Sequence, residues 1–254
     1  MPLRVVISGA SSGLGLALAR HYLERGAIVA AFARRGGLLQ ALATDFPGRV
    51  FCYVLDVRDV PAIQNAARDF IPRVGVPDVV IANAGVSSGT LTEYAADIEA
   101  FQQVMDINVL GIVKTFQPFI AAMRAAQQGT LVGIASVAGF RGLPGASAYS
   151  ASKAAAISYL ESLRVELHGS GVKVVTICPG YIKTPMTAVN PYRMPFILDA
   201  DDAARRMARV IERQIPFAVV PWQMSLVGRV LKCIPNWVYD RLFVNAPRKP
   251  RVKG

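Results

Sequence analysis

Short apolar runs alternate with helical segments along most of this chain. Leu3–Ile7, Ala27–Ala33 and Val50–Leu55 are mostly apolar runs of strand length. Between them, Gly13–Arg25 and Val60–Ile71 carry apolar side chains at helical spacing. A strand that is apolar on both faces has to be covered on both faces, which happens in a parallel sheet with a helix after each strand. The alternation therefore predicts a doubly wound α/β fold.

The same alternation continues to about residue 220. Further strands are expected at Asp78–Ala82, Thr130–Ala135, Val172–Cys178 and Phe217–Val220. Further helices are expected at Leu38–Asp45, Asp97–Gln127, Ala148–His168 and Asp199–Gln214. We expect one domain over residues 1–220, a doubly wound parallel sheet (Rossmann fold) of six or seven strands with helices on both faces. An apolar and basic extension, residues 221–254, follows it.

Composition excludes several classes of protein. Hydrophobic residues make up 53% of the 254 residues, enough to build a core, so disorder is excluded. The chain has only two histidines, and Cys52, Cys178 and Cys233 include no closely spaced pair. Neither a disulfide scaffold nor a bound metal is therefore expected. The unpaired thiols, and the Arg4 that interrupts the apolar N-terminus, favour a cytoplasmic protein.

A glycine-rich loop follows the first expected strand. Its glycines have the spacing G-x-x-x-G-x-G and stand between a strand and a helix. Glycine allows a tight turn and a close approach to a ligand, and a helix N-terminus offers N–H groups to a pyrophosphate. A glycine-rich turn without a ligand is the alternative. The residues expected to bind a dinucleotide here are Gly9, Ser11, Ser12, Gly13, Leu14 and Gly15.

This loop resembles that of the short-chain dehydrogenase/reductase family, in its compact single-domain form. Other Rossmann enzymes carry G-x-G-x-x-G, which this chain lacks. Ser8 stands where the family has Thr and keeps the hydroxyl. After the fourth strand, Asn83-Ala84-Gly85 resembles the family's N-N-A-G, with Ala82 in place of the first Asn. The resemblance covers roughly residues 3–215 and implies a nicotinamide cofactor.

The end of the second strand bears on which nicotinamide cofactor is used. Arg34 and Arg35 stand there, and no acidic residue is present to accept a hydrogen bond from the ribose 2′-hydroxyl of NAD. Guanidinium groups bind phosphate through charge-assisted hydrogen bonds. In the family, an Arg at this place goes with NADP. NADP(H) is therefore favoured over NAD(H); two solvated loop arginines are the alternative.

The resemblance implies further cofactor contacts at later strand ends. Asp56 corresponds to the residue that meets the adenine amino group; a helix N-cap is the alternative, and Asp59 suits that role equally well. Ile182 and Thr184 correspond to the contacts of the nicotinamide carboxamide. The remaining contacts that the family implies are Val57, Asn83, Ala84, Gly85, Tyr149, Lys153, Pro179 and Gly180.

Tyr149 and Lys153 form a Y-x-x-x-K pair in an expected helix. Residues four apart lie on one helical face, so the phenol and the ammonium project together. A tyrosine with a pKa of about 10 is poorly matched to proton transfer at neutral pH, and a nearby ammonium is expected to lower that pKa. Tyr149 is therefore a candidate general acid and base. In the family, the lysine also binds the nicotinamide ribose.

Two more residues complete the catalytic set that the family implies. Ser136, after the fifth strand, corresponds to the serine that hydrogen-bonds the substrate oxygen. Asn108 corresponds to the asparagine that holds a water in a proton relay. With Tyr149 and Lys153, they imply an NADP(H)-dependent enzyme that interconverts a carbonyl and an alcohol. The alternatives are a catalytically silent dinucleotide-binding sensor and a membrane-recruited scaffold on the same fold.

The segments expected around the substrate are mostly uncharged. Val86–Thr92, Val137–Ser147 and Met186–Leu198 carry aromatic and aliphatic side chains and few charges. They favour an apolar small-molecule substrate, with packing as lid or core as the alternative.

The C-terminal extension concentrates positive charge. Residues 221–254 hold seven basic residues and one acidic residue, so +6 of the net charge of +11 lies there. Apolar side chains, Trp222 and Trp237 among them, alternate with these charges. The extension is expected to form either a subunit interface or a peripheral contact with the inner face of an anionic membrane. The family implies a homodimer or homotetramer, and no nucleic-acid motif accompanies the charge.

Overall fold

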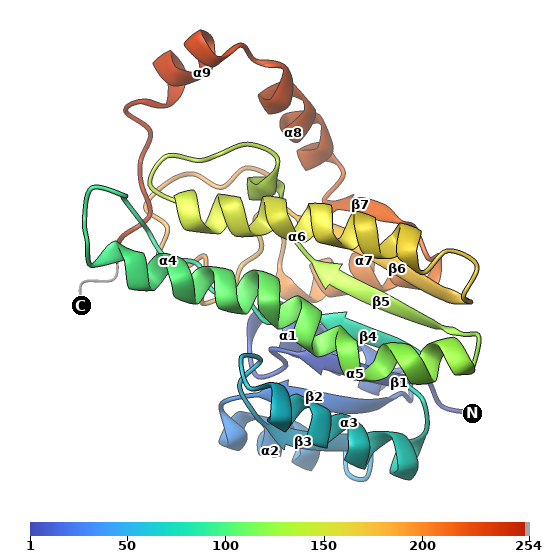
Figure 1. Cartoon of the computed structure of the whole chain (residues 1–254). Coiled ribbons are helices and arrows are strands. Elements are labelled where there is room, and N and C mark those ends of the chain that lie inside the picture. The colour runs from blue at the N-terminus through green and yellow to red at the C-terminus, as the bar shows by residue number, and fades with distance from the viewer. Residues whose placement is uncertain (252–254) are drawn as a thin grey trace.

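The fold is a single parallel sheet between two layers of helices (Figure 1). The structure is a computed structural model that describes residues 1–251, so Lys253 of the basic extension lies outside the described residues. Within them, seven strands are ordered β3-β2-β1-β4-β5-β6-β7. The strands are β1 (Arg4–Ser8), β2 (Ile28–Ala33), β3 (Val50–Val54), β4 (Val79–Ala82), β5 (Gly129–Ile134), β6 (Val172–Pro179) and β7 (Phe217–Val220). The predicted doubly wound parallel sheet is confirmed.

Helices cover both faces of this sheet. They are α1 (Gly13–Glu24), α2 (Gly36–Asp45), α3 (Val60–Val74), α4 (Asp97–Met105), α5 (Gly111–Ala125), α6 (Ser147–Glu166), α7 (Ala200–Glu212), α8 (Gln223–Cys233) and α9 (Asn236–Phe243). Helices α1, α2 and α7 contribute to the buried cluster on one face, and α3, α5 and α6 to the cluster on the other.

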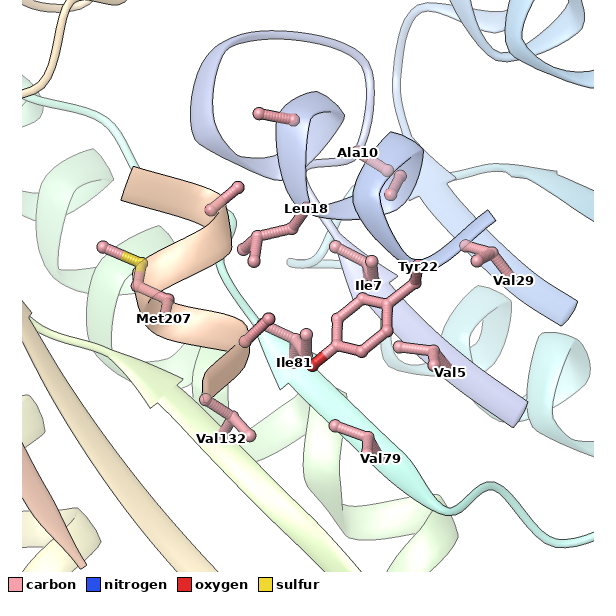
Figure 2. Close-up of a cluster of buried hydrophobic side chains, with 14 of the residues drawn as sticks. Val5, Ile7, Ala10, Leu18, Tyr22, Val29, Val79, Ile81, Val132 and Met207 are labelled. Carbon is pink, nitrogen blue, oxygen red and sulfur yellow. The ribbon is translucent and has the colours of Figure 1, made fainter. Parts of the chain in front are cut away.

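The strands are apolar throughout because successive side chains enter different clusters. Val5 and Ile7 of β1 belong to the α1/α7 side, whereas Val6 belongs to the α3/α5 side. On the first side, Tyr22 of α1 and Met207 of α7 lie over the central strands (Figure 2), and both are buried. This two-sided burial, predicted from the continuous apolar runs, is the main hydrophobic contribution to stability.

The long helical stretch Asp97–Ala125 is interrupted in its middle. A π-helical turn, η1 (Asp106–Leu110), joins α4 to α5. Among the described residues, this stretch alone is long and apolar enough to span a membrane, and a core helix passes the same test. Phe116, Phe119 and Met123 are fully buried against the sheet, so α5 is part of the core.

The C-terminal extension forms two helices and a returning segment. Helix α8 follows β7, the edge strand, and α9 stands beyond it, away from the sheet (Figure 1). The chain then runs back to the loop after β4, where Arg251 forms a parallel bridge with Gly89. We call residues 247–251 the C-terminal strap.

Candidate cofactor and active site

Loops at the carboxyl ends of the strands enclose a cavity of about 390 Å³. Every residue predicted to contact the cofactor lines it, from Gly9 to Thr184. Ser136, Tyr149 and Lys153 line it as well, and Asn108 lies outside its wall. In parallel α/β sheets this edge is where ligands bind, because the strands' C-terminal loops converge there. The cavity extends from the end of β3 to the end of β6, so it suits an elongated ligand.

The glycine loop has no space for side chains at its closest point. A Cβ on Gly15 would overlap the Gly9 carbonyl oxygen and the Asn83 side-chain amide. Gly9 also has φ of 72°, in the left-handed region that favours glycine. The Ser8 hydroxyl accepts hydrogen bonds from the backbone N–H groups of Asn83 and Ala84, both at 3.2 Å. This hydroxyl, retained where the family has Thr, ties the loop after β4 to the glycine loop.

Arg35 lies against the glycine loop. Its Nη2 donates to Ser11 Oγ at 3.0 Å and to Ser12 Oγ at 2.5 Å. Arg34 is exposed as well, and its guanidinium lies 3.9 Å from the Asp56 carboxylate. Arg35 is therefore not a freely solvated loop residue. Together with two serine hydroxyls it forms a cluster of donors at the end of β2, which suits a phosphate.

Asp56 lines the cavity and does not cap a helix. The N-cap of α3 is Asp59, whose Oδ1 accepts from the Ala62 backbone N–H at 3.1 Å. Asp56 instead accepts two hydrogen bonds from the Arg58 guanidinium, at 3.1 and 2.8 Å. These bonds with Arg58 lower the pKa of Asp56. The carboxylate therefore stays charged at neutral pH at the cavity wall.

Lys153 is buried beside the phenol of Tyr149. Its side chain projects from α6, is 4% exposed, and its Nζ donates to the Ile134 carbonyl oxygen at 2.9 Å. The same Nζ lies 5.8 Å from the centroid of the Tyr149 ring. Burial lowers the pKa of Lys153 to about 8. The residues four apart on α6 therefore do project together, as their spacing predicts.

The pKa of Tyr149 moves in the direction opposite to the expected one. Burial raises it, and the neighbouring Ser136 hydroxyl only partly offsets that effect. The Lys153 ammonium was expected to lower this pKa, but its hydrogen bond is directed to Ile134 and desolvation of the phenol dominates. Tyr149 is therefore protonated at neutral pH and can donate a proton.

Ser136 is held in place at the end of β5. Its Oγ accepts from the Ala138 backbone N–H at 3.1 Å, capping the 3-10 turn η2 (Val137–Gly139), and lies 3.5 Å from the Pro179 carbonyl oxygen. The residue is 7% exposed. The hydroxyl therefore has a fixed position facing the cavity shared with Tyr149.

Asn108 lies behind the cavity wall and does not line the cavity. It lies in the π-helical turn η1, a type of distortion often found at functional sites. Its Nδ2 donates to the Val86 carbonyl oxygen and to Ser152 Oγ, both at 2.9 Å, and its Oδ1 accepts from the Val86 N–H at 2.8 Å. Both amide hydrogens are used, so only Oδ1 has capacity left for a water. Asn108 thus fixes the loop after β4 relative to α6.

The segment after β6 closes the other side of the cavity. A Cβ on Gly13 would contact the Thr184 side chain, so this segment lies directly over the glycine loop. Thr187 Oγ1 accepts from the Thr184 N–H at 3.1 Å and donates to the Ile182 carbonyl oxygen at 2.5 Å. Pro179 and Gly180 complete this wall.

The C-terminal strap packs beside the site without lining the cavity, and the sequence did not predict its individual contacts. Lys249 Nζ donates to the carbonyl oxygen of Met186, a residue of the cavity wall, at 3.1 Å. Arg251 donates to both carboxylate oxygens of the buried Asp97, at 2.8 and 3.0 Å, and its guanidinium stacks over Tyr94. The strap therefore joins the segments after β4 and β6. The residues that the strap contacts are far from it in the sequence, and no sequence motif predicts these contacts.

Comparison with known proteins identifies the family. The model of the short chain dehydrogenase family matches residues 4–193. The chain belongs to the short-chain dehydrogenase family. It is an oxidoreductase that acts on CH–OH groups with a nicotinamide dinucleotide. These comparisons support neither alternative, the catalytically silent sensor nor the membrane-recruited scaffold.

The similar proteins include bacterial oxidoreductases. An uncharacterized oxidoreductase of Myxococcus xanthus is 40% identical over 92% of this chain and 94% of its own length. A 2-dehydro-3-deoxy-L-rhamnonate dehydrogenase (NAD(+)) of Sphingomonas is 34% identical over 71% of this chain and 72% of its own. A short chain dehydrogenase from Burkholderia cenocepacia in complex with NADP has a TM-score of 0.81 and 27% identity, covering 95% of this chain and 97% of that one. The similar proteins thus include one named for NAD and one bound to NADP.

The described residues contain no cluster of three His, Cys, Asp or Glu side chains that could hold a metal ion. The chemistry available in the cavity comes from the hydroxyl groups of Ser136 and Tyr149 and the ammonium of Lys153.

Proposed function

We propose that this enzyme uses NADP(H) to reduce the carbonyl group of an apolar ketone or aldehyde to an alcohol, and catalyses the reverse reaction. One observation carries the proposal. Ser136, Tyr149 and Lys153 line the same cavity as Arg35 and the glycine loop. The candidate proton donor, Tyr149, and the cluster around Arg35 that suits a phosphate therefore lie in the wall of the same elongated cavity.

The fit to NADP rests on the donor cluster at the end of β2. Arg35 shares its Nη2 between Ser11 Oγ and Ser12 Oγ, leaving the rest of its guanidinium for a phosphate. Asp56, the acidic residue in the cavity wall, is already paired with Arg58 and lies at the end of β3. Gly9 and Gly15 let the glycine loop pack closely on the segment after β4, and both line the cavity in which the diphosphate would lie.

In the reduction, the bound cofactor supplies a hydride to the carbonyl carbon. Tyr149 donates its hydroxyl proton to the carbonyl oxygen, and its raised pKa keeps that proton available at neutral pH. Ser136 donates a hydrogen bond to the same oxygen and orients it. The Lys153 ammonium stabilises the phenolate that Tyr149 becomes. It would also hold the nicotinamide ribose, as the resemblance to the family implies. Asn108 is a positioning residue, because it holds the loop after β4 against α6.

The substrate side favours an apolar compound. In the segment after β6, the rings of Tyr181 and Tyr192 lie with centroids 6.4 Å apart, and burial raises the pKa of both phenols. Met186 adds a thioether to the cavity wall. The strap carries three cations, Arg248, Lys249 and Arg251. The Lys249 ammonium is bonded to the Met186 carbonyl oxygen, and Arg251 is paired with Asp97.

The test is NADPH oxidation by the purified enzyme on a panel of apolar and polar ketones and aldehydes. The expected result is NADPH consumption with an equal amount of alcohol formed, fastest on apolar members and slower with NADH. Tight binding of NADPH without turnover of any carbonyl would contradict the proposal. Faster turnover with NADH would contradict its cofactor assignment alone.

A further inference from the structure

Helix α8 is apolar on two opposite sides. Its inner side packs on the enzyme: Met224 is buried against Gly180, and Gly228 is pressed against the Phe140 ring. Its outer side carries Trp222, Leu226 and Val230, which are 65, 53 and 59% exposed. Residues four apart form one line along a helix. A surface helix of a water-soluble fold normally carries polar residues opposite its buried side. The apolar residues on the outer side of α8 are therefore expected to bind another molecule.

Helix α9 extends the exposed apolar surface. Trp237 is 71% exposed, and Leu242 and Val244 are each about 60% exposed. Both helices stand outside the layers of the sheet, beyond its β7 edge (Figure 1). Trp237 and Val244 are seven residues apart and lie on one side of α9, whereas Leu242 lies on the other. We call Trp222, Leu226, Val230, Trp237 and Val244 the α8–α9 face.

The two helices are firmly attached, so this face is not a loose tail. Arg141 donates to the carbonyl oxygens of Leu231 and Ile234 at the end of α8, which satisfies groups that a helix end leaves unpaired. Its guanidinium also lies 4.0 Å from the centroid of the Tyr239 ring. The Tyr239 hydroxyl donates to the Gly142 carbonyl oxygen at 2.6 Å. An anchored, exposed apolar surface of this kind indicates a binding partner.

The charges on these helices decide between the partners. Arg229, Lys232 and Arg241 are exposed there, and Asp240 is their one acidic neighbour. A second copy of the chain would bring a second net positive surface against this one, which is unfavourable. A bilayer with anionic headgroups complements them, and tryptophan is enriched at the boundary between headgroups and acyl chains.

We propose that the α8–α9 face docks the enzyme on the surface of a bilayer that contains anionic lipids. Trp222, Leu226 and Trp237 enter the acyl boundary, while Arg229 and Arg241 contact lipid phosphates. Since Arg141 and Tyr239 join these helices to the loop that follows Ser136 and η2, docking brings the substrate side of the cavity next to the bilayer.

The experiment is flotation of the purified full-length enzyme with phosphatidylcholine vesicles, with and without about 30% phosphatidylserine. We expect binding to the anionic vesicles and its loss when NaCl is raised to about 0.5 M. The double variant L226S/V230S should bind at least about tenfold more weakly. L38S/V54S is the matched control, because Leu38 and Val54 are also exposed, on α2 and β3. Thermal unfolding and NADPH binding of each variant check that it is folded.

Three results would overturn the docking proposal. One is the absence of flotation of the wild type, and another is flotation that L226S/V230S leaves unchanged. The third is light scattering that gives an oligomer for the wild type and a smaller species for L226S/V230S, without vesicle binding by either; the face is then an interface between copies. None of these readouts depends on catalysis, so they are independent of the proposed reaction.

Discussion

Among single residues, Lys153 combines full burial with a charge. Its ammonium has one protein acceptor, the Ile134 carbonyl oxygen, and no carboxylate pairs with it among the described residues. Taking an ammonium out of water favours its neutral form, which is why burial lowers the pKa of Lys153 from 10.5 to about 8. The folded protein therefore holds this proton less tightly than the unfolded chain does. Burying the charged Lys153 ammonium beside the Tyr149 phenol therefore lowers the free energy of unfolding.

This cost predicts a pH-dependent difference between the wild type and Lys153→Met. Below pH 8 the lysine is charged in both states, and the folded wild type bears the full cost. Between pH 8 and 10.5 the folded state loses the proton first, so the stability of the wild type rises with pH. We expect the wild type to gain up to roughly 3 kcal/mol relative to the variant over this window.

Urea unfolding of both proteins at several pH values measures this change. Met also leaves the Ile134 carbonyl oxygen without a donor, which shifts the variant's stability equally at every pH. The change with pH therefore isolates the charge. A constant difference between the two proteins across the window would show that Lys153 titrates normally.

Arg35 gives the second prediction at this scale. Arg35→Gln removes a charged donor beside Ser11 and Ser12 but keeps a polar side chain. A hydrogen bond to a charged group contributes about 1.5–3 kcal/mol, so KM for NADPH should rise about tenfold to a hundredfold. NADH, which has no 2′-phosphate, should be nearly unaffected. Steady-state kinetics with both cofactors test this, and an equal loss for NADH would assign Arg35 a structural role instead.

At the scale of elements, the first turn of α1 depends on a glycine. A Cβ at Gly15 would overlap the Gly9 carbonyl oxygen, so Gly15→Ala must displace the glycine loop. Overpacking of this kind costs about 1–3 kcal/mol. We expect a lower unfolding temperature and weaker NADPH binding, measured by cofactor fluorescence.

Gly37→Ala is the matched control for that variant. A Cβ at Gly37, in α2, would meet nothing within 4 Å. Alanine is the better helix former by about 1 kcal/mol, so Gly37→Ala should leave stability unchanged or raised. If both variants bind NADPH like the wild type, the close fit of α1 to the glycine loop plays no part in binding.

The C-terminal strap should affect the substrate more than the cofactor. It contacts the loop after β4 through Gly89 and the segment after β6 through Met186. Arg251→Gln removes the ion pair with Asp97 that holds it there. We expect a several-fold higher KM for the carbonyl substrate with little change in NADPH affinity. A parallel loss of NADPH affinity would mean that the strap supports the whole cavity.

Elements with a local sequence signal could be predicted, and the others could not. The apolar run at residues 217–220 gives β7 at its observed bounds, and α3 begins at Val60 as expected. The stretch 97–127 was expected to be largely helical, but the π-helical turn at Asp106–Leu110 follows from packing that its own residues do not reveal. Helices α8 and α9 were not predicted as helices. Several of their exposed residues are apolar, so the sequence lacks the alternation of an apolar and a polar side that marks a surface helix.

For the whole molecule, the gathering of the predicted residues around one cavity could be predicted, because the fold places strand ends together. Residues as distant as Gly9 and Thr184 line one cavity, since both follow strands of one parallel sheet. The direction of the Tyr149 pKa was not predictable. It depends on how far the phenol is shielded and on Lys153 bonding to Ile134, and both are properties of the assembled structure.

The central claim is that Tyr149 supplies the proton in carbonyl reduction. The most direct measurement compares NADPH oxidation by the wild type and Tyr149→Phe on a carbonyl that the wild type reduces, with NADPH affinity measured for both. We expect the rate to fall about 10²- to 10⁴-fold, with NADPH affinity nearly unchanged, because Phe keeps the ring and removes the proton. Equal rates for the two proteins would contradict the account.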